Sequence, residues 1–386
     1  MVDLKNWLEQ QREKGGLRSL RPVLSRGKGR LFLAEDADRE LLDFSSNDYL
    51  GLAEHPALIA AAHESLSRFG TGSGAARLMS GDLAVHHELE DAVAQLKGKE
   101  AALTFGSGYM ANAGIIPALV GRNDLVFSDR LNHASIHDGC RLSGARLVRF
   151  RHNDLNHLEE LLKEKRGTGT ALIVVESIYS MDGDRCPLRE LVQIKERFSC
   201  LLMVDEAHAT GVFGANGGGI IEEDGVGDGV DLAMGTFGKA LGSYGAYTAG
   251  SWEMIEYLLN RARSFIFSTA LPPAVAAASL AAVQLIRQEP ALRQDLHEKI
   301  AYFKAILRSG GYGANLGPSQ IIPILVGESR TALEKTDLLR KQGIFATAVR
   351  PPTVPEGTAR LRFSITRHHS ITDLSLAARA LLEIMD

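Results

Sequence analysis

The sequence contains few cysteines, no apolar run of membrane length and almost no excess of charge of one sign. Its three cysteines, Cys140, Cys186 and Cys200, form no CxxC pair, so they predict neither a disulfide framework nor a zinc site. A sparse, odd set is typical of a reducing cytoplasm, where each cysteine is expected to be a small buried hydrophobe. Lysine plus arginine number 43 and aspartate plus glutamate 47, a formal charge of −4. That balance argues against a protein that binds nucleic acid mainly through bulk charge, although it leaves open a local basic groove.

No segment has the pattern of a membrane span or of a secretory signal. The best candidate, residues 272–286, is rich in alanine, carries Ser279 and Gln284, and is shorter than the ~20 residues that a spanning helix needs. Residues 1–16 mix both signs of charge and lack an apolar stretch followed by a small-residue cleavage site. We therefore expect a cytoplasmic protein with no membrane partner.

Alternating helical and strand patterns dominate the chain from about residue 56 to residue 270. With 386 residues, 45% hydrophobic and 23% charged, the composition is that of a globular protein with more than one domain. The expected strands are short apolar runs at 101–105, 125–129, 146–150, 171–177, 201–207, 231–237 and 246–251. Strands that alternate with helices predict an α/β fold with a mostly parallel sheet covered on both faces.

The last part of the chain has a different pattern. Helical periodicity runs over about 272–309 and 331–342, and strands are expected at 320–327, 344–350 and 359–366. The last strand alternates strictly, with Leu361, Phe363 and Ile365 on one face and Arg360, Arg362 and Ser364 on the other. One buried and one polar face predict an antiparallel sheet, and hence a second, smaller α+β domain.

These patterns divide the chain into three parts. Residues 1–50 are expected to pack on the small domain, residues 51–288 to form the large domain, and residues 289–386 to form the small C-terminal domain.

The first motif that carries chemistry is the glycine turn at 106–111, which follows an expected strand and opens a helix. Glycines there let backbone N–H groups approach an anion at the helix N-terminus. The turn alone matches a dinucleotide fingerprint of the GxGxxA type, with Asp124 or Asp129 as the expected acidic residue. A tight turn without a ligand explains the same pattern.

The second motif, DEAH, places Asp205 at the end of an apolar strand and His208 three residues later. The same letters occur in ATP-driven helicases, which also need a GxxxxGK[ST] loop. Around Lys239 that loop fails twice, because Ala233 stands where a glycine is required and Ala240 follows the lysine. Asp205 therefore either caps a helix or pairs with a protonated nitrogen heterocycle.

The third motif surrounds Lys239 with glycines and puts Thr236 three residues before it. A solvated surface lysine is the ordinary interpretation of one such residue. Glycines permit close ligand approach, a threonine hydroxyl can bond a phosphate, and a desolvated lysine can form a Schiff base. A glycine turn, a strand-end aspartate and a glycine-flanked lysine, in this order, are what pyridoxal phosphate (PLP) requires.

At these residues the sequence resembles the fold-type I PLP enzymes and, among them, the α-oxoamine synthase family. The resemblance implies a large domain with a seven-stranded, mostly parallel sheet. The matching blocks run through most of the chain: SSNDYLGL (45–52), FGTGSGAARLMSG (69–81), SDRLNHASIHDG (128–139), ESIYSMDGD (176–184), DEAHATG (205–211), GTFGKALGSYGA (235–246), FSTALPP (267–273) and RPPTVPEGTARLR (350–362).

The resemblance implies a role for each matching residue. Lys239 would hold the cofactor covalently and act as the base, His133 would stack on the pyridine ring and border the substrate, and Asp205 would keep the ring nitrogen protonated. His208 would bond the phenolic oxygen. The other cofactor contacts would come from Gly108, Tyr109, Glu176, Ser180 and Thr236, and from Ser268 and Thr269 of a neighbouring subunit.

The substrates follow from the same resemblance. Asn47 and Arg362 would grip the carboxylate of the amino acid, while Arg21 and Thr353 would meet the acyl substrate. Within the family, the blocks at 69–81 and 350–362 favour the condensation of L-alanine with a pimeloyl thioester in biotin biosynthesis. Glycine C-acetyltransferase, 5-aminolevulinate synthase and serine palmitoyltransferase activities are the alternatives. The carrier, coenzyme A or acyl carrier protein, stays open; a homodimer is expected, and no metal.

Overall fold

The computed structural model describes residues 3–313 and 316–385. The chain divides into two compact units. The small unit consists of the described residues of Met1–Gly51, Ser180–Asp184 and Gln294–Asp386, and the large unit of Leu52–Tyr179 and Arg185–Arg293. The division expected from the sequence left Ser180–Asp184 within the large domain and placed the second boundary at residue 288, whereas the large unit extends to Arg293.

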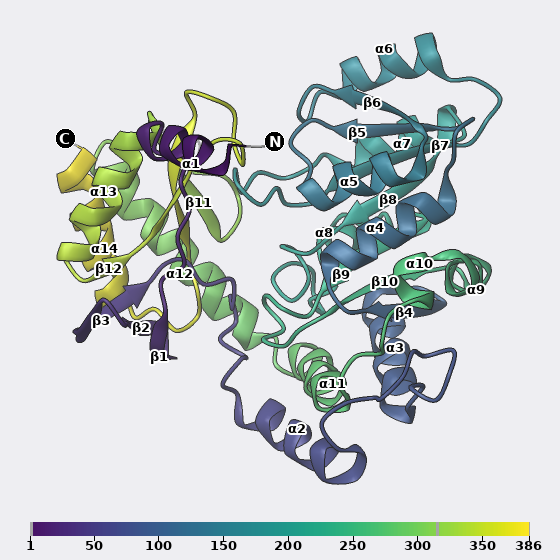
Figure 1. Ribbon diagram of the computed structural model, residues 1–386, viewed down its shortest axis with the longest axis horizontal. Helices are drawn as coiled ribbons and strands as arrows, with labels where there is room; N and C mark the ends of the chain where they lie inside the picture. The colour runs from purple at the N-terminus through teal and green to yellow at the C-terminus, as the bar shows by residue number, and fades with distance from the viewer. Residues whose placement is uncertain (1–2, 314–315, 386) are drawn as a thin grey trace. The chain divides into compact units, whose positions relative to one another are not determined.

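The large unit is built on a seven-stranded sheet, drawn among its helices in Figure 1. The strand order is β4-β10-β9-β8-β7-β5-β6, and only β10 runs antiparallel to its neighbours. The α/β fold with a mostly parallel seven-stranded sheet is thus confirmed. The strands are β4 (Ala101–Phe105), β5 (Leu125–Asp129), β6 (Arg146–Phe150), β7 (Ala171–Glu176), β8 (Leu201–Asp205), β9 (Leu232–Thr236) and β10 (Ala246–Gly250).

Helices bury the faces of this sheet because its strands are apolar on both sides; every residue of β7, for example, is buried. One core cluster joins side chains of the central strands to Ile115 of α4, Ile136 of α5 and Leu258 of α9. The helices of the unit are α2 (Pro56–Phe69), α3 (Ala84–Lys97), α4 (Gly108–Leu119), α5 (Ala134–Ser143), α6 (Leu155–Lys165), α7 (Leu188–Arg197), α8 (Ile220–Asp224), α9 (Trp252–Arg261), α10 (Arg263–Ile266) and α11 (Pro273–Gln288).

The sheet brings the ends of three neighbouring strands to one edge. Glu176 ends β7, Asp205 ends β8 and Thr236 ends β9. Because these strands are parallel and Glu176 pairs in register with Asp205, their last residues lie side by side. Such an edge is where open α/β sheets bind ligands.

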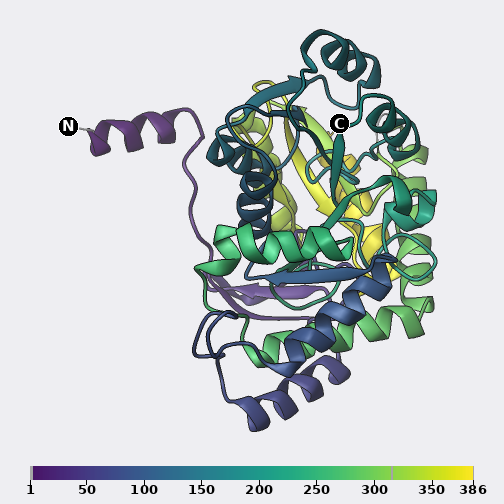
Figure 2. The ribbon, with the colours of Figure 1, turned by 90° about the vertical axis from the view of Figure 1, so that its right-hand side faces the viewer.

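The small unit contains two further sheets, one with the order β1-β2-β3-β12 and one with the order β11-β14-β13. Figure 2 shows α1, which carries the N-terminus, projecting away from β1–β3. The elements are α1 (Leu4–Glu13), β1 (Val23–Gly27), β2 (Arg30–Leu33), β3 (Asp36–Asp43), α12 (Ala291–Ser309, which begins in the large unit), β11 (Ile321–Gly327), α13 (Ser329–Lys341), β12 (Ile344–Phe345), β13 (Thr347–Val349), β14 (Ala359–Ser364) and α14 (Ile371–Met385).

Strand β14 is antiparallel to both neighbours, as its alternation predicts, but the polar face expected opposite the buried one is buried too. The guanidinium groups of Arg360 and Arg362 tolerate burial because protein acceptors meet them: Asp182 takes a hydrogen bond from Arg360, and the carbonyl oxygen of Ser180 takes one from Arg362. The alternating pattern therefore predicted the strand correctly, but the prediction that its polar face is exposed was wrong.

Other expectations from composition concern the cysteines and membrane segments. Cys140, Cys186 and Cys200 are all free and buried, as expected. Among the described residues, no helix combines the length and the apolar character that crossing a membrane would need.

Candidate active site

The start of α4 forms a cradle in the large unit. Ser107 caps the helix, its Oγ accepting from the N–H of Met110 at 3.2 Å. A Cβ added to Gly108 would lie 2.8 Å from Thr236 Cγ2, so this close approach requires glycine. Thr236 Oγ1 is buried and meets no hydrogen-bond partner within the described chain. Backbone N–H groups of a helix N-terminus beside a hydroxyl that lacks a partner suit a phosphate group.

Tyr109, the second residue of α4, contributes its backbone to the same turn. Its side chain is half exposed and donates from its hydroxyl to Asp138 Oδ2 at 2.7 Å.

Asp205 places a buried carboxylate at the end of β8. Its Oδ1 accepts from the N–H of Ala207 at 2.9 Å, and its Oδ2 accepts from Nδ2 of Asn112 at 3.1 Å. The residue is 6% exposed, and a buried carboxylate is stabilised by a cationic partner. A cationic partner such as a protonated ring nitrogen would satisfy this buried carboxylate.

Lys239 faces an imidazole and not open solvent. Its Nζ lies 3.0 Å from Nε2 of His208, which is buried, and the lysine itself is half-buried. The loop that carries it is closed by backbone bonds between Phe237 and both Gly245 and Ser243. An amine held against a histidine in a partly dry site fits covalent attachment to an aldehyde.

His133 and Glu176 meet at the start of α5. His133 is the N-cap of that helix, and its backbone N–H donates to Oε1 of Glu176 at the end of β7. Burial, opposed by the charge of Asp205, lowers the pKa of His133, so the ring is neutral at pH 7.

The small unit brings Arg362 and Asn47 together. Arg362 donates from Nε to the carbonyl oxygen of Ser180 at 2.8 Å and from NH1 to Ser364 Oγ at 2.8 Å. Its NH2 donates to Asn47 Oδ1 at 3.1 Å, and that same oxygen accepts from the hydroxyl of Tyr49 at 3.0 Å. The guanidinium fork is thus fixed in orientation, as carboxylate binding requires.

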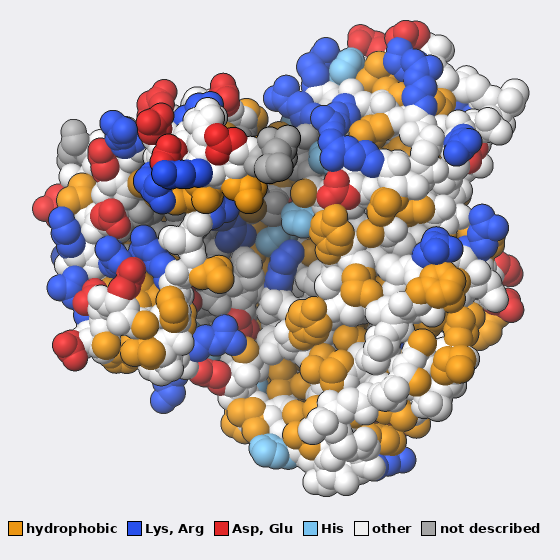
Figure 3. All heavy atoms as spheres, in the orientation of Figure 1, with side chains coloured by type: hydrophobic (Ala, Val, Ile, Leu, Met, Phe, Trp, Pro, Cys, Tyr) orange, Lys and Arg blue, Asp and Glu red, His pale blue; other side chains and the backbone are white. Residues whose placement is uncertain are grey.

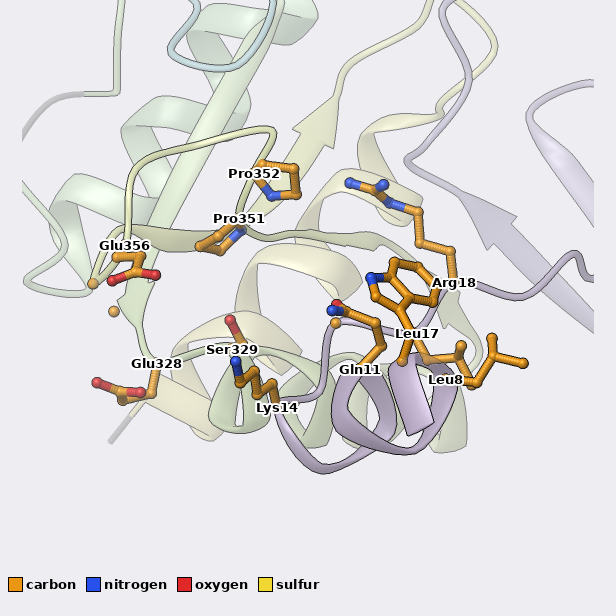
Figure 4. Close-up of a pocket in the computed structure, with 14 residues that line it drawn as sticks. Leu8, Gln11, Lys14, Leu17, Arg18, Glu328, Ser329, Pro351, Pro352 and Glu356 are labelled. Carbon is orange, nitrogen blue, oxygen red and sulfur yellow. The ribbon is translucent and has the colours of Figure 1, made fainter. Parts of the chain in front are cut away.

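The two residues expected at the acyl substrate have different surroundings. Arg21 is exposed and pairs with Glu35 at 3.4 Å, whereas Thr353 Oγ1 accepts from Arg18 at 3.1 Å. Arg18 also lines a pocket of about 860 Å³ between α1 and the loop at 351–357, shown in Figure 4 with Pro351 and Pro352 across the hollow from α1. The structure therefore brings Arg18, and not Arg21, to Thr353.

Ser268 and Thr269 follow α10. Ser268 Oγ donates to the carbonyl oxygen of Thr269 at 3.3 Å, and Thr269 forms an isolated bridge with Ala76. Phe267, just before them, is 70% exposed.

The structure does not support the alternative of a dinucleotide-binding site. Asp129 is fully buried and accepts from the backbone N–H groups of Leu131 and Asn153, while Asp124 accepts from those of Gly121 and Thr170. Neither carboxylate is oriented to bind a ribose. In the described ranges, no group of three or more histidine, cysteine, aspartate or glutamate side chains could hold a metal ion.

Three residues of the site were not identified from the sequence. Asn112 touches Asp205, Ser135 touches His133, and Tyr49 touches Asn47. Ser135 and Tyr49 stand inside matched blocks, two residues from their partners, which is a signal. Asn112 stands outside the blocks, and its partner Asp205 is 93 residues away.

Comparison with known proteins agrees with this geometry. The sequence profile of the aminotransferase class I and II family matches residues 39–381. An 8-amino-7-oxononanoate synthase of Geobacter sulfurreducens is 52% identical over 379 residues, which cover 98% of this chain and 96% of that protein. A structure of serine palmitoyltransferase from S. paucimobilis with a bound PLP–myriocin aldimine has a TM-score of 0.92 at 28% identity, covering 99% of this chain and 96% of that one. The 8-amino-7-oxononanoate synthase of Francisella tularensis has a TM-score of 0.77 at 28% identity over 89% of this chain and 97% of that one. The chain belongs to the 8-amino-7-oxononanoate synthases of the aminotransferase class I and II family.

Proposed function

We propose that this chain condenses L-alanine with a pimeloyl thioester to give 8-amino-7-oxononanoate, carbon dioxide and the free carrier thiol, with PLP as its cofactor, in biotin biosynthesis. The observation that carries the proposal is the identity of 52% to a curated 8-amino-7-oxononanoate synthase along 98% of the chain. The alternative activity of glycine C-acetyltransferase differs in both substrates, so a substrate screen separates the two.

The residues of the large unit fit the cofactor. The first turn of α4, with Gly108 and Tyr109, and Thr236 Oγ1 would hold its phosphate, Asp205 its ring nitrogen, and Lys239 its aldehyde carbon. We expect His133 on the ring face, His208 at the phenolic oxygen, and Glu176 and Ser180 around the site. When bound, PLP supplies an electron sink that stabilises negative charge on the α-carbon of alanine.

The chain's own groups would then handle protons and orientation. Lys239 Nζ would take the α-proton of alanine and later return a proton to the product, with His208 Nε2 at 3.0 Å to hold the amine in place. Asp205 is a buried anion whose charge favours a cation opposite it throughout turnover.

Arg362 and Asn47 would bind the alanine carboxylate. The guanidinium presents a fork already oriented by Ser180, Ser364 and Asn47, which lowers the entropy cost of a bidentate contact. A fixed carboxylate decides which bond of the α-carbon is aligned for cleavage. We propose Thr353 and Arg21 at the acyl substrate, and either coenzyme A or acyl carrier protein as the carrier.

We also propose a homodimer that places Ser268 and Thr269 in the partner's site, in the cytoplasm. Figure 3 shows orange side chains spread over the α10–α11 side of the large unit, where charged side chains are sparse. Met79 is 79% exposed and Phe267 70% exposed, an exposure typical of an interface. The buried free cysteines suit a reducing compartment. Light scattering coupled to size exclusion tests the dimer: a monomeric holoenzyme with full activity would contradict it.

The decisive experiment follows carbon dioxide release from the PLP-loaded protein. Alanine with pimeloyl-coenzyme A, or with pimeloyl-acyl carrier protein, is expected to release carbon dioxide, and glycine with acetyl-coenzyme A is not. Borohydride reduction followed by mass spectrometry should add the cofactor's mass to the peptide that contains Lys239, and Lys239→Ala should lose both the adduct and the turnover. Stoichiometric cofactor without product from either pimeloyl substrate would refute the assignment.

A further inference from the structure

A buried chain of hydrogen bonds links His133 to Asp205 through two residues with no assigned role. Asn112 Nδ2 donates to Asp205 Oδ2 at 3.1 Å and to Ser135 Oγ at 2.9 Å. Ser135 Oγ lies 2.7 Å from Nδ1 of His133. Asn112 on α4 and Ser135 on α5 are each 1% exposed. The chain thus runs across α4, α5 and the end of β8, away from solvent.

The chemistry of the members fixes the direction of each bond. An ionised carboxylate only accepts, so the edge of Asn112 that faces Asp205 must be the NH₂ group and not the oxygen. The second hydrogen of that NH₂ points to Ser135 Oγ, which is therefore the acceptor there. The hydroxyl hydrogen of Ser135 is left to point at the third member, Nδ1 of His133.

The backbone agrees with this direction. The N–H of Ser135 also donates to Nδ1 of His133, at 3.2 Å. A proton on Nδ1 would face a backbone donor and would force the Ser135 hydroxyl to reverse against Asn112. The ring proton of His133 therefore belongs on Nε2, and burial lowers the pKa of His133 and keeps the ring neutral.

We propose that Asn112 and Ser135 are positioning residues that hold His133 as the neutral tautomer protonated at Nε2 and tie its ring to the carboxylate of Asp205. The consequence for turnover rests on the proposed function: the ring presents a hydrogen-bond donor, at Nε2, in the site that binds the cofactor and substrate. The tautomer of His133 is a property of the protein without its cofactor and can be measured in the absence of any ligand.

Nitrogen-15 NMR of histidine-labelled protein tests the tautomer directly. His133→Gln identifies the signals of residue 133. In the unsubstituted protein, Nδ1 should resonate in the unprotonated, pyridine-like range and Nε2 in the protonated, pyrrole-like range. Ser135→Ala removes the hydroxyl donor, so the two signals should move toward each other as the tautomers mix. Ser279→Ala is the matched control, because Ser279, in α11, is equally buried and its Oγ donates to Ser243 Oγ at 2.9 Å. This substitution should leave both signals in place.

An isosteric change at Asn112 tests the hydrogen bonds on the Asp205 side of Ser135. In Asn112→Asp the new carboxyl group shares a proton with Asp205 and accepts from the Ser135 hydroxyl. It thereby draws that hydrogen away from His133, so the same mixing of tautomers is expected. The kcat with alanine and pimeloyl-coenzyme A should fall about five- to tenfold in Ser135→Ala, the loss of one hydrogen bond, and further in Asn112→Asp. Melting temperatures of both variants check that they fold.

The outcomes separate this proposal from the proposed function. A proton on Nδ1 in the unsubstituted protein, or signals that Ser135→Ala does not move, overturns the positioning role even if turnover is normal. An Nε2 proton that responds to both variants, in a protein that does not turn over pimeloyl substrates, supports the positioning role and refutes the proposed function.

Discussion

Lys97 donates to Glu206 inside the large unit, where the two side chains are 1% and 0% exposed. Lys97 Nζ also donates to the carbonyl oxygen of Gly218, and Glu206 Oε1 accepts from the N–H of Ile220 at 2.7 Å, at the start of α8. Burial alone would lower the pKa of Lys97, but the charges of Glu206 and Tyr247 and the hydrogen bonds to them together outweigh burial and raise that pKa. Because Glu206 directly follows Asp205, this ion pair holds the end of β8 in place.

Breaking the ion pair from one side should be costly. Lys97→Met leaves the Glu206 carboxylate buried without its cation, which is expected to lower the free energy of unfolding by about 3–5 kcal/mol. Chemical denaturation of both proteins measures the difference. Lys163→Met is the control, since Lys163 forms a solvent-screened surface pair with Glu159 at 2.8 Å and its loss should cost far less. Equal small losses in the two variants would contradict a structural role for Lys97.

A methyl group at Gly108 should weaken cofactor binding. The new Cβ would lie 2.8 Å from Thr236 Cγ2, so either the start of α4 or the threonine must shift. Losing one hydrogen bond to a charged group costs about 1.5–3 kcal/mol, and a Kd for PLP raised about ten- to a hundredfold is expected from that range. Absorbance titration of the cofactor-free protein measures it. Gly167→Ala, where a Cβ meets nothing within 4 Å, should bind PLP normally; unchanged affinity in Gly108→Ala would remove α4 from the phosphate site.

Much of the large unit could be predicted from the sequence because its strands are apolar on both faces. The small unit was harder to predict, since four of the five residues of β1 are exposed and β3 carries Asp36, Asp38 and Arg39 among its first residues. No alternation marks such strands; β3 gains its place by pairing with β2 and, at its last two residues, with β12, which lies about three hundred residues later.

The candidate site shows the same limit. Lys239, Asp205 and Thr236 carry motif signals because the chemistry needs those side chains at those strand ends. Arg362 Nε donates to the backbone carbonyl oxygen of Ser180. Because every residue carries such a carbonyl, the residue types in the sequence cannot predict this contact. Asn112 is likewise significant only because α4 crosses the end of β8, and a buried polar contact of that kind requires three-dimensional knowledge.

Arg362 and Arg360 offer a matched pair on one strand. Both are buried on β14, but Arg360 bonds Asp182 whereas Arg362 is expected to bind the alanine carboxylate. Arg362→Lys loses the planar fork and should raise the KM for alanine about ten- to a hundredfold, from about 1.5–3 kcal/mol of charged hydrogen bonding. Arg360→Lys should change that KM far less. Steady-state kinetics at saturating thioester measures both, and a similar KM in the two variants would argue against Arg362 as the carboxylate ligand.

His369 should make the small unit sensitive to acid. Its ring stacks on Phe44 at 4.1 Å, its Nε2 donates to the carbonyl oxygen of Asp43 at 3.0 Å, and its Nδ1 accepts from the N–H of Thr366 at 3.1 Å. Burial lowers the pKa of His369 to about 4, with smaller opposing contributions from the Asp43 carbonyl and from the charge of Asp373. The folded protein therefore holds a neutral ring at a pH where the unfolded chain binds a proton.

The resulting stability is fully present above an unfolded pKa of about 6.5 and is lost as the pH falls toward 4. At pH 5 the loss amounts to about 2 kcal/mol of unfolding free energy for this one group. Urea denaturation at pH 7 and pH 5 measures it. His369→Phe keeps the stacking surface but cannot titrate, so it should be less stable at pH 7 yet lose about 2 kcal/mol less than the unsubstituted protein between the two pH values. The same loss in both proteins would mean that other groups, and not His369, set the acid sensitivity.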